Sequence, residues 1–126
     1  MNYTRESANI LLEAAELQEK KGNDYNNSLS RVSQSDYYQR GVFTILDIAY
    51  GKILRMYSVL ELIEHGGNAN FESIEDSAID LINYSSFIAA YMRGDVPGQT
   101  GDKDIFNKKI TPETNINLIP TKFRNA

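Results

Sequence analysis

The sequence predicts an all-α fold: a compact helical bundle of three main helices plus short helical pieces, with an extended C-terminal tail. Three segments place apolar residues three and four apart, which is the spacing of one face of an α-helix. All three prolines lie beyond Gly94, where no helical or strand period lasts more than a few residues. We therefore expect a helical domain over residues 1–93 and an extended tail over residues 94–126.

Length and composition bound the class of protein. A chain of 126 residues fits one domain that can build a core without disulfides. The sequence contains no cysteine, which excludes disulfide scaffolds, zinc–thiolate sites and thiol nucleophiles. Its first residues lack the features of a secretory signal, and no window approaches the roughly 20 apolar residues of a membrane span. We expect a soluble, cytoplasmic protein with no membrane partner.

The charge is unevenly distributed along the chain. The net charge is −4, and residues 1–93 hold 8 basic and 13 acidic groups. Because duplex binding usually needs a basic patch, nucleic acid is not expected as a main partner. Free nucleotides stay open as ligands, since a metal ion can bridge acidic protein groups to phosphates.

The first helix is expected from about Thr4 to Lys21, with Thr4 as its cap. Gly22 can take the left-handed position after a helix, so the helix should stop there. Residues 23–28 are rich in asparagine, aspartate and serine, which predicts a loop that could line a site. A short helical or irregular stretch should follow over residues 29–39. The apolar face of the helix is formed by Ser7, Ile10, Ala14 and Leu17, with Ala8, Leu11 and Ala15 beside them.

The second helix, from about Val42 to Glu64, has the clearest period. Gly51 in its middle costs about 1 kcal/mol relative to alanine, which indicates a close helix crossing or the approach of a ligand. Gly66 and Gly67 should end the helix. Its apolar residues alternate three and four apart and form a bundle-type seam: Leu46, Ala49, Ile53, Met56, Leu60 and Ile63.

The third helix carries four oxygen-bearing side chains in one row. At 3.6 residues per turn they fall within a sector of roughly 80°. Such a row suits magnesium, which proteins bind through a few carboxylates, waters and substrate phosphates. The same face continues with apolar residues such as Phe87 and Tyr91, so we interpret the row as the wall of a metal or phosphate site. Its members are Glu72, Asp76, Asp80 and Asn83.

A structural interpretation of the same residues remains open. Ser73, followed three residues later by Asp76, is also the pattern of a helix cap with a carboxylate that reaches back. Glu75 and Asp76 would then favour the positive end of the helix dipole. Repulsion along the row does not decide between the two, because like charges four apart cost only about 0.2 to 0.5 kcal/mol per pair.

Lys52 and Arg55 lie three apart, beside the seam of the second helix. The short connection to the third helix favours antiparallel packing, which would point both side chains toward the acidic row. They would then either contact phosphate or form ordinary ion pairs.

Three short pieces, in this order, carry a family resemblance: Lys-Lys-Gly-Asn-Asp24-Tyr25, Lys52-Ile-Leu-Arg55, and the stretch from Glu72 to Tyr84. Together they resemble the phage nucleotide modification associated domain family, which is similar in turn to the MazG-like all-α nucleoside triphosphate pyrophosphatases. The resemblance covers roughly residues 5–93. It implies a helical bundle, usually a homo-oligomer, and in the MazG-like enzymes magnesium binding and cleavage between the α and β phosphates.

If the chain is an enzyme of this kind, Glu72 and Asp76 are the catalytic residues, and together with Asp80 they hold magnesium. Lys52 and Arg55 would stabilise charge that develops on the phosphates.

The remaining expected ligand contacts come from three other residues. Asn83 would orient the ligand or a metal-bound water. Asp24 and Tyr25 would contact the base or sugar, although turn formation explains both of them equally well.

The expected function is that of a phage-type MazG-like nucleotide-binding protein in the cytoplasm of a bacterial host cell. Its expected activity is magnesium-dependent pyrophosphohydrolysis of a nucleotide or deoxynucleotide. Two alternatives remain: a protein that binds nucleotides or cyclic nucleotides without turnover, and a structural phage protein whose acidic row is plain surface.

Overall fold

The computed structural model describes residues 2–25, 27–68 and 73–99. These residues form three long helices and a short 3-10 helix, and no strand occurs within these ranges: α1 (Glu6–Tyr25), η1 (Gln34–Tyr37), α2 (Val42–Glu64) and α3 (Ile74–Met92). The predicted all-α bundle of three main helices with a short helical piece is confirmed. Most of the predicted tail, residues 100–126, lies outside the described residues. None of the described helices combines the length and apolar character needed to cross a membrane.

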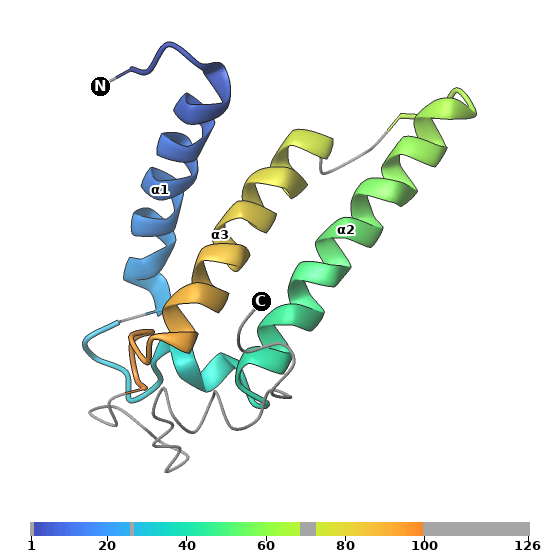
Figure 1. Ribbon diagram of the computed structural model, residues 1–126. Helices are drawn as coiled ribbons and strands as arrows, with labels where there is room; N and C mark the ends of the chain where they lie inside the picture. Colours follow the sequence, from blue (N-terminus) through green and yellow to red (C-terminus); the bar gives the residue numbers. More distant parts are fainter. Residues whose placement is uncertain (1, 26, 69–72, 100–126) are drawn as a thin grey trace, which may run out of the picture.

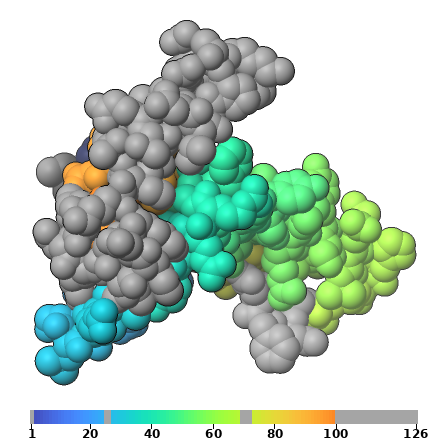
Figure 2. Space-filling view, turned by 90° about the horizontal axis from the view of Figure 1, so that it is seen from below, coloured from blue at the N-terminus to red at the C-terminus, as the bar shows by residue number. Residues whose placement is uncertain are grey.

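The three long helices lie side by side, with α3 between α1 and α2 (Figure 1). α2 runs antiparallel to the other two, as the short connection between α2 and α3 predicts. α3 packs against both neighbours, and its contact with α2 is the more extensive one. Seen from below, α2 forms one flank of the molecule, coloured teal to yellow-green in Figure 2. Residues from three different helices can therefore meet only around α3.

Glycines end α2 and α3 in the same way. Gly66 has a φ of +83°, and the amide of Gly67 donates to the carbonyl of Leu62 over 2.9 Å. Gly94 has a φ of +76° after the end of α3. Left-handed glycines allow the chain to turn back and bond the last carbonyls of a helix. The predicted end of α2 at Gly66 and Gly67 is confirmed.

α1 differs from its predicted bounds at both ends. It begins at Glu6, with the carbonyl of Arg5 accepting from the amide of Ala8 over 3.1 Å. It continues through Gly22 to Tyr25, so the predicted stop at Gly22 and the predicted loop over residues 23–25 are wrong. A glycine inside a helix costs only about 1 kcal/mol, and another turn of backbone hydrogen bonds offsets that cost.

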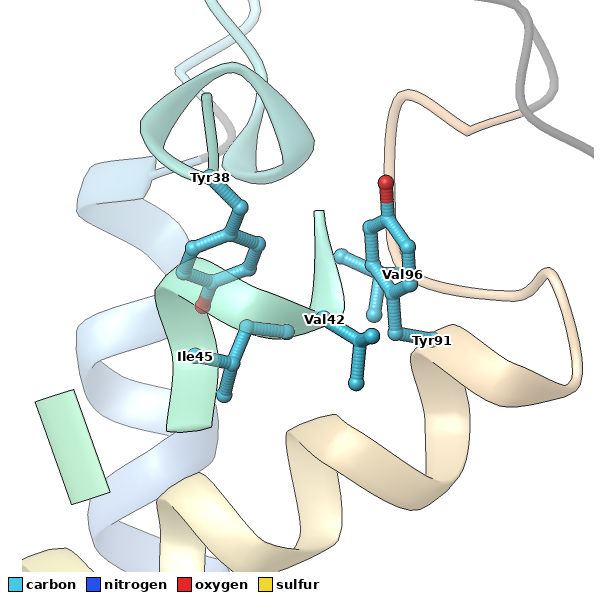
Figure 3. Close-up of a cluster of buried hydrophobic side chains, with 5 residues drawn as sticks. All are labelled: Tyr38, Val42, Ile45, Tyr91 and Val96. Atoms are coloured by element: carbon cyan, nitrogen blue, oxygen red, sulfur yellow. The ribbon is translucent and has the colours of Figure 1, made fainter. Parts of the chain in front are cut away.

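The hydrophobic core lies where η1, the start of α2 and the end of α3 meet. Figure 3 shows its five buried side chains. The Tyr38 and Tyr91 rings pack edge to face, with centroids 6.4 Å apart and an interplanar angle of 75°. Burial raises the pKa of the Tyr91 hydroxyl above its usual value of 10.0. The five members are Tyr38, Val42, Ile45, Tyr91 and Val96.

Residues 94–99 are fastened to the helices. The side chain of Gln99 accepts from the amide of Val96 over 2.7 Å and donates to the carbonyl of Tyr91 over 3.1 Å. The carbonyl of Pro97 accepts from the amide of Ser35 over 3.0 Å. The start of the predicted tail is thus part of the folded unit and closes one end of it.

The predicted seam of α2 is buried only in part. Ala49 is buried and Met56 is half-buried. The other four members are exposed, and the prediction is wrong for them: Leu46, Ile53, Leu60 and Ile63. α2 is apolar on two faces. The face that packs on α3 is not the predicted seam but a different side of the helix. Its buried members are Val42, Ile45, Ala49 and Val59.

Gly51 lies in open space on α2. A Cβ built there meets no atom within 4 Å. The predicted close helix crossing at Gly51 is therefore wrong for the described residues, and the alternative, the approach of a ligand, stays a prediction.

Candidate functional site

Asp76 lies in the first turn of α3, where it caps the helix. Its amide donates to the Ser73 hydroxyl over 3.0 Å, and its carboxylate accepts from the Ser73 amide over 3.4 Å. This is the reciprocal capping box that the sequence allowed as the alternative interpretation. The side chain is exposed. Glu72, its expected partner in catalysis and metal binding, lies outside the described residues.

Replacing Ser73 with alanine is expected to lower the free energy of unfolding by about 1 kcal/mol, because it removes the hydroxyl that accepts from the first turn of α3. Urea unfolding followed by circular dichroism measures the change. Ser85→Ala, at an exposed position within the same helix, is the matched control and should leave stability unchanged. Equal losses in both variants would contradict the capping role.

Asp80, one turn further along α3, lies among three helices. Its carboxylate is 3.1 Å from Nζ of Lys52 on α2 and 3.7 Å from Nζ of Lys21 on α1. Its side chain is 21 % exposed and that of Lys52 is 27 % exposed, so the pair is shielded from most of the solvent. The predicted approach of Lys52 to the acidic row is confirmed. Lys21 was not predicted, because it was taken as the end of the first helix.

Asn83 is buried and belongs to a small network of polar side chains. Its Oδ1 accepts from Nε2 of Gln18 over 3.2 Å, and the same Nε2 donates to the Ser86 hydroxyl over 3.0 Å. The Ser86 hydroxyl in turn donates to the Asn83 carbonyl over 2.7 Å. Since the amide oxygen of Asn83 is engaged by Gln18, its NH₂ group retains the donors that a ligand could use.

A cavity of about 240 Å³ lies beside Asp80 and Asn83. It lies between the end of α1, the middle of α3, η1 and the segment after α3. Tyr84 and Phe87 form an aromatic wall, with ring centroids 5.6 Å apart in an edge-to-face arrangement. We name this cavity the amide pocket. Its lining is Gln18, Glu19, Lys21, Gly22, Gln34, Asp80, Asn83, Tyr84, Phe87, Ala90, Asp95, Val96 and Pro97.

Three other predicted site residues are placed differently. Arg55 is exposed on α2 and is not part of the pocket lining. Asp24 is exposed in the last turn of α1 and is also outside the lining. Tyr25 is the last residue of α1, and its side chain lies outside the described part of the chain. The structure therefore brings Lys52 to Asp80 and places Asp80 and Asn83 in one pocket, whereas Arg55 and Asp24 lie outside the pocket lining.

Two of the three predicted magnesium ligands, Asp76 and Asp80, lie within the described residues. Among residues 2–25, 27–68 and 73–99, no group of three or more acidic, histidine or cysteine side chains lies close enough to hold a metal ion. Asp76 is engaged in the helix cap, and two lysine ammonium groups face Asp80. Since Glu72 is outside the described residues, magnesium binding by Glu72, Asp76 and Asp80 stays a prediction.

Comparison of the chain with protein-family models, with curated proteins and with solved structures finds no match. Its function must therefore be inferred from the chemistry of the amide pocket.

Proposed function

We propose that this chain binds a nucleotide, with the base in the amide pocket and the phosphates at Lys21 and Lys52. The observation that carries the proposal is the meeting of side-chain amides, aromatic rings and Lys21 around one cavity, with Lys52 joined to the lining residue Asp80 by an ion pair. Each of these groups suits a different part of a nucleotide.

The amides suit the edge of a base. Gln18, Gln34 and Asn83 line the pocket, and a carboxamide offers both donors and an acceptor on one flat group. Base edges present the same combination of donors and acceptors, which is why asparagine and glutamine pair with them. Tyr84 and Phe87 supply ring surface against which a base can pack.

The size of the cavity limits which part of the ligand enters. Pockets that enclose a drug-sized ligand usually measure about 300 to 1,000 Å³, and this one measures about 240 Å³. The volume suits a base with part of its sugar and leaves the phosphates at the mouth. Lys21 and Asp80 lie in the lining, so a phosphate at the mouth would be within reach of charged groups.

Asp80 prepares the two lysines for an anion. An ammonium group has three donors, so Lys21 and Lys52 can each keep a bond to Asp80 and still donate to a phosphate oxygen. In this arrangement Asp80 positions the cations, and the amides select the base.

Magnesium-dependent hydrolysis between the α and β phosphates is the second candidate. It is favoured by Asp76 and Asp80, which lie one turn apart on α3, and by the resemblance to the MazG-like enzymes. A metal ion would have to displace the helix cap from Asp76 and compete with two lysines for Asp80. The contacts therefore favour binding over turnover.

Calorimetric titration with a panel of ribonucleotides, deoxynucleotides and cyclic nucleotides tests the proposal. Binding is expected with magnesium and also with EDTA, and no pyrophosphate should be released. Gln18→Leu should weaken binding by about tenfold through the loss of amide bonds in the pocket. Gln39→Leu, at an exposed position outside the lining, is the matched control. If the folded protein binds none of the panel, the proposal is wrong, and pyrophosphate release with magnesium would establish the second candidate.

A further inference from the structure

Two buried side-chain amides each leave one end without a protein partner. Gln34 and Asn83 are only 5 % and 7 % exposed. Nε2 of Gln34 donates to the Tyr38 hydroxyl over 3.0 Å, and its Oε1 has no hydrogen bond within the described ranges. Oδ1 of Asn83 accepts from Gln18, and its NH₂ group has no acceptor there. A buried polar group in this state costs free energy unless a ligand or water bonds to it.

Both unpartnered ends open on the amide pocket. Gln34 and Asn83 line this cavity. In the part of the chain that the structure describes, only the Ser77 hydroxyl is both sealed from solvent and unbonded. Oε1 of Gln34 and the NH₂ group of Asn83 are therefore not sealed, and they open on the cavity that these residues line. Because the protein holds the other end of each amide, the pocket presents one fixed acceptor and one fixed donor to a ligand.

A carboxylate adds a second acceptor beside Gln34. Asp95 lines the pocket, and no described residue bonds to or pairs with its carboxylate. The amide of Ser35 donates to the carbonyl of Pro97 over 3.0 Å, which joins η1 to the segment after α3. Ser35 follows Gln34 directly, and Pro97 lies two residues after Asp95. The two acceptors therefore belong to adjoining walls of the pocket, whereas the donor of Asn83 comes from α3.

The Asp95 carboxylate and the two lysines lie toward opposite ends of the site. The amide of Asp95 donates to the carbonyl of Ala90, which lies ten residues after Asp80 on α3. Ten residues of helix span roughly 15 Å. At physiological salt, charges separated by more than about 8 Å are largely screened. A carboxylate at this end can therefore contact a base without repelling phosphates that are bound beside Asp80.

One donor and two neighbouring acceptors match the pairing edge of one base. The pairing edge of guanine carries one acceptor, O6, followed by two donors, the ring N–H and the 2-amino group. Cytosine, uracil and thymine carry one donor and two acceptors on this edge, and adenine carries one of each. Proteins that hold a base in a pocket read it through hydrogen bonds to this edge. A hydrogen bond to a carboxylate is roughly twice as strong as one between neutral groups, so the aspartate adds most to the selection.

We propose that the amide pocket selects guanine nucleotides, with Asn83 donating to O6, Gln34 accepting from the ring N–H and Asp95 accepting from the 2-amino group. This inference rests on the proposed function and narrows it to one base. It assigns Asp95, an exposed residue outside the helices, as the residue that determines specificity.

Calorimetric titration of the full chain with the five monophosphates of guanosine (GMP), inosine (IMP), adenosine, cytidine and uridine tests the base. GMP should bind about ten- to a hundredfold more tightly than the adenine, cytosine and uracil nucleotides. IMP lacks only the 2-amino group of GMP, so it should bind about tenfold more weakly than GMP. Nucleotide binding in which GMP is no tighter than IMP would overturn this inference and leave the proposed function standing. The absence of binding to every nucleotide would overturn both.

Asp95→Ala separates base recognition from a structural role. It should lower the affinity for GMP to that for IMP and leave the affinity for IMP unchanged, because IMP has no 2-amino group to lose. Asp95→Asn should lower the ratio of the two affinities only in part, since a neutral acceptor makes the weaker bond. Glu13→Ala, at an exposed position of α1 outside the lining, is the matched control and should keep the wild-type ratio. If Asp95→Ala weakens both ligands alike and the ratio stays, Asp95 acts only on the shape of the pocket and the inference is wrong.

Discussion

Replacing Gly41 with alanine is expected to lower the free energy of unfolding by about 2 to 4 kcal/mol, because two effects add at this residue. Gly41 precedes α2 with φ +62° and ψ −133°, a backbone conformation that costs other residues about 1 to 3 kcal/mol. A Cβ at this position would also lie 2.9 Å from the Tyr91 hydroxyl oxygen. That ring is fully buried and packs against Tyr38, so it cannot move aside without disturbing the core.

Urea unfolding followed by far-ultraviolet circular dichroism measures this loss. Gly22→Ala is the matched control, since Gly22 is helical and an added Cβ there meets no atom within 4 Å. The control should raise stability by up to about 1 kcal/mol, through helix propensity and a less flexible unfolded chain. If Gly41→Ala were as stable as the wild type, the tight contact between the start of α2 and Tyr91 could not be present.

The sequence predicted the long helices well where local signals agreed. The bounds of α2 are those expected, because a sustained apolar period is closed by Gly66 and Gly67. The prediction that α1 ends at Gly22 failed, since a glycine is compatible both with the end of a helix and with its interior. The prediction of the buried face of α2 also failed, because that helix has two apolar faces and only the packing of α3 selects between them.

The candidate site was predicted in part. The pairing of Lys52 with Asp80 followed from antiparallel packing of neighbouring helices. Gln18 was missed because its hydrogen-bond partner, Asn83, lies 65 residues away in the sequence and meets it only through the packing of α1 on α3. A signal for it was present: Gln18 and Lys21 continue the apolar stripe of α1 at spacings of four and three from Ala14, so polar groups fall on the packed side of the helix. The pattern of Ser73 and Asp76 was interpreted first as part of a metal or phosphate site, with a helix cap as the alternative, and the structure shows the cap.

Replacing Lys52 with methionine is expected to weaken nucleotide binding by about ten- to a hundredfold and to lower the free energy of unfolding by about 1 to 2 kcal/mol. The loss of affinity follows from the removal of one charged donor to phosphate, which is worth about 1.5 to 3 kcal/mol. The loss of stability follows because Asp80 is mostly shielded and would keep only Lys21, at 3.7 Å. A pair shielded to this degree lies between exposed ion pairs, worth up to about 1 kcal/mol, and fully buried ones.

Lys52 has two proposed roles, phosphate binding and the stabilising ion pair with Asp80. Calorimetric titration and urea unfolding of the same variants separate them. Lys20→Met removes an exposed cation of α1 that lies outside the pocket lining, and it should change the nucleotide affinity and the free energy of unfolding little. Lys52→Met combined with Asp80→Leu should recover much of the stability, because no unbalanced charge remains in the shielded site, but it should not recover the affinity. Recovery of stability without affinity is the outcome that a phosphate-binding lysine requires. A purely structural ion pair would instead leave nucleotide affinity unchanged in every folded variant, and such a result would remove the lysines from the site while leaving the fold as described.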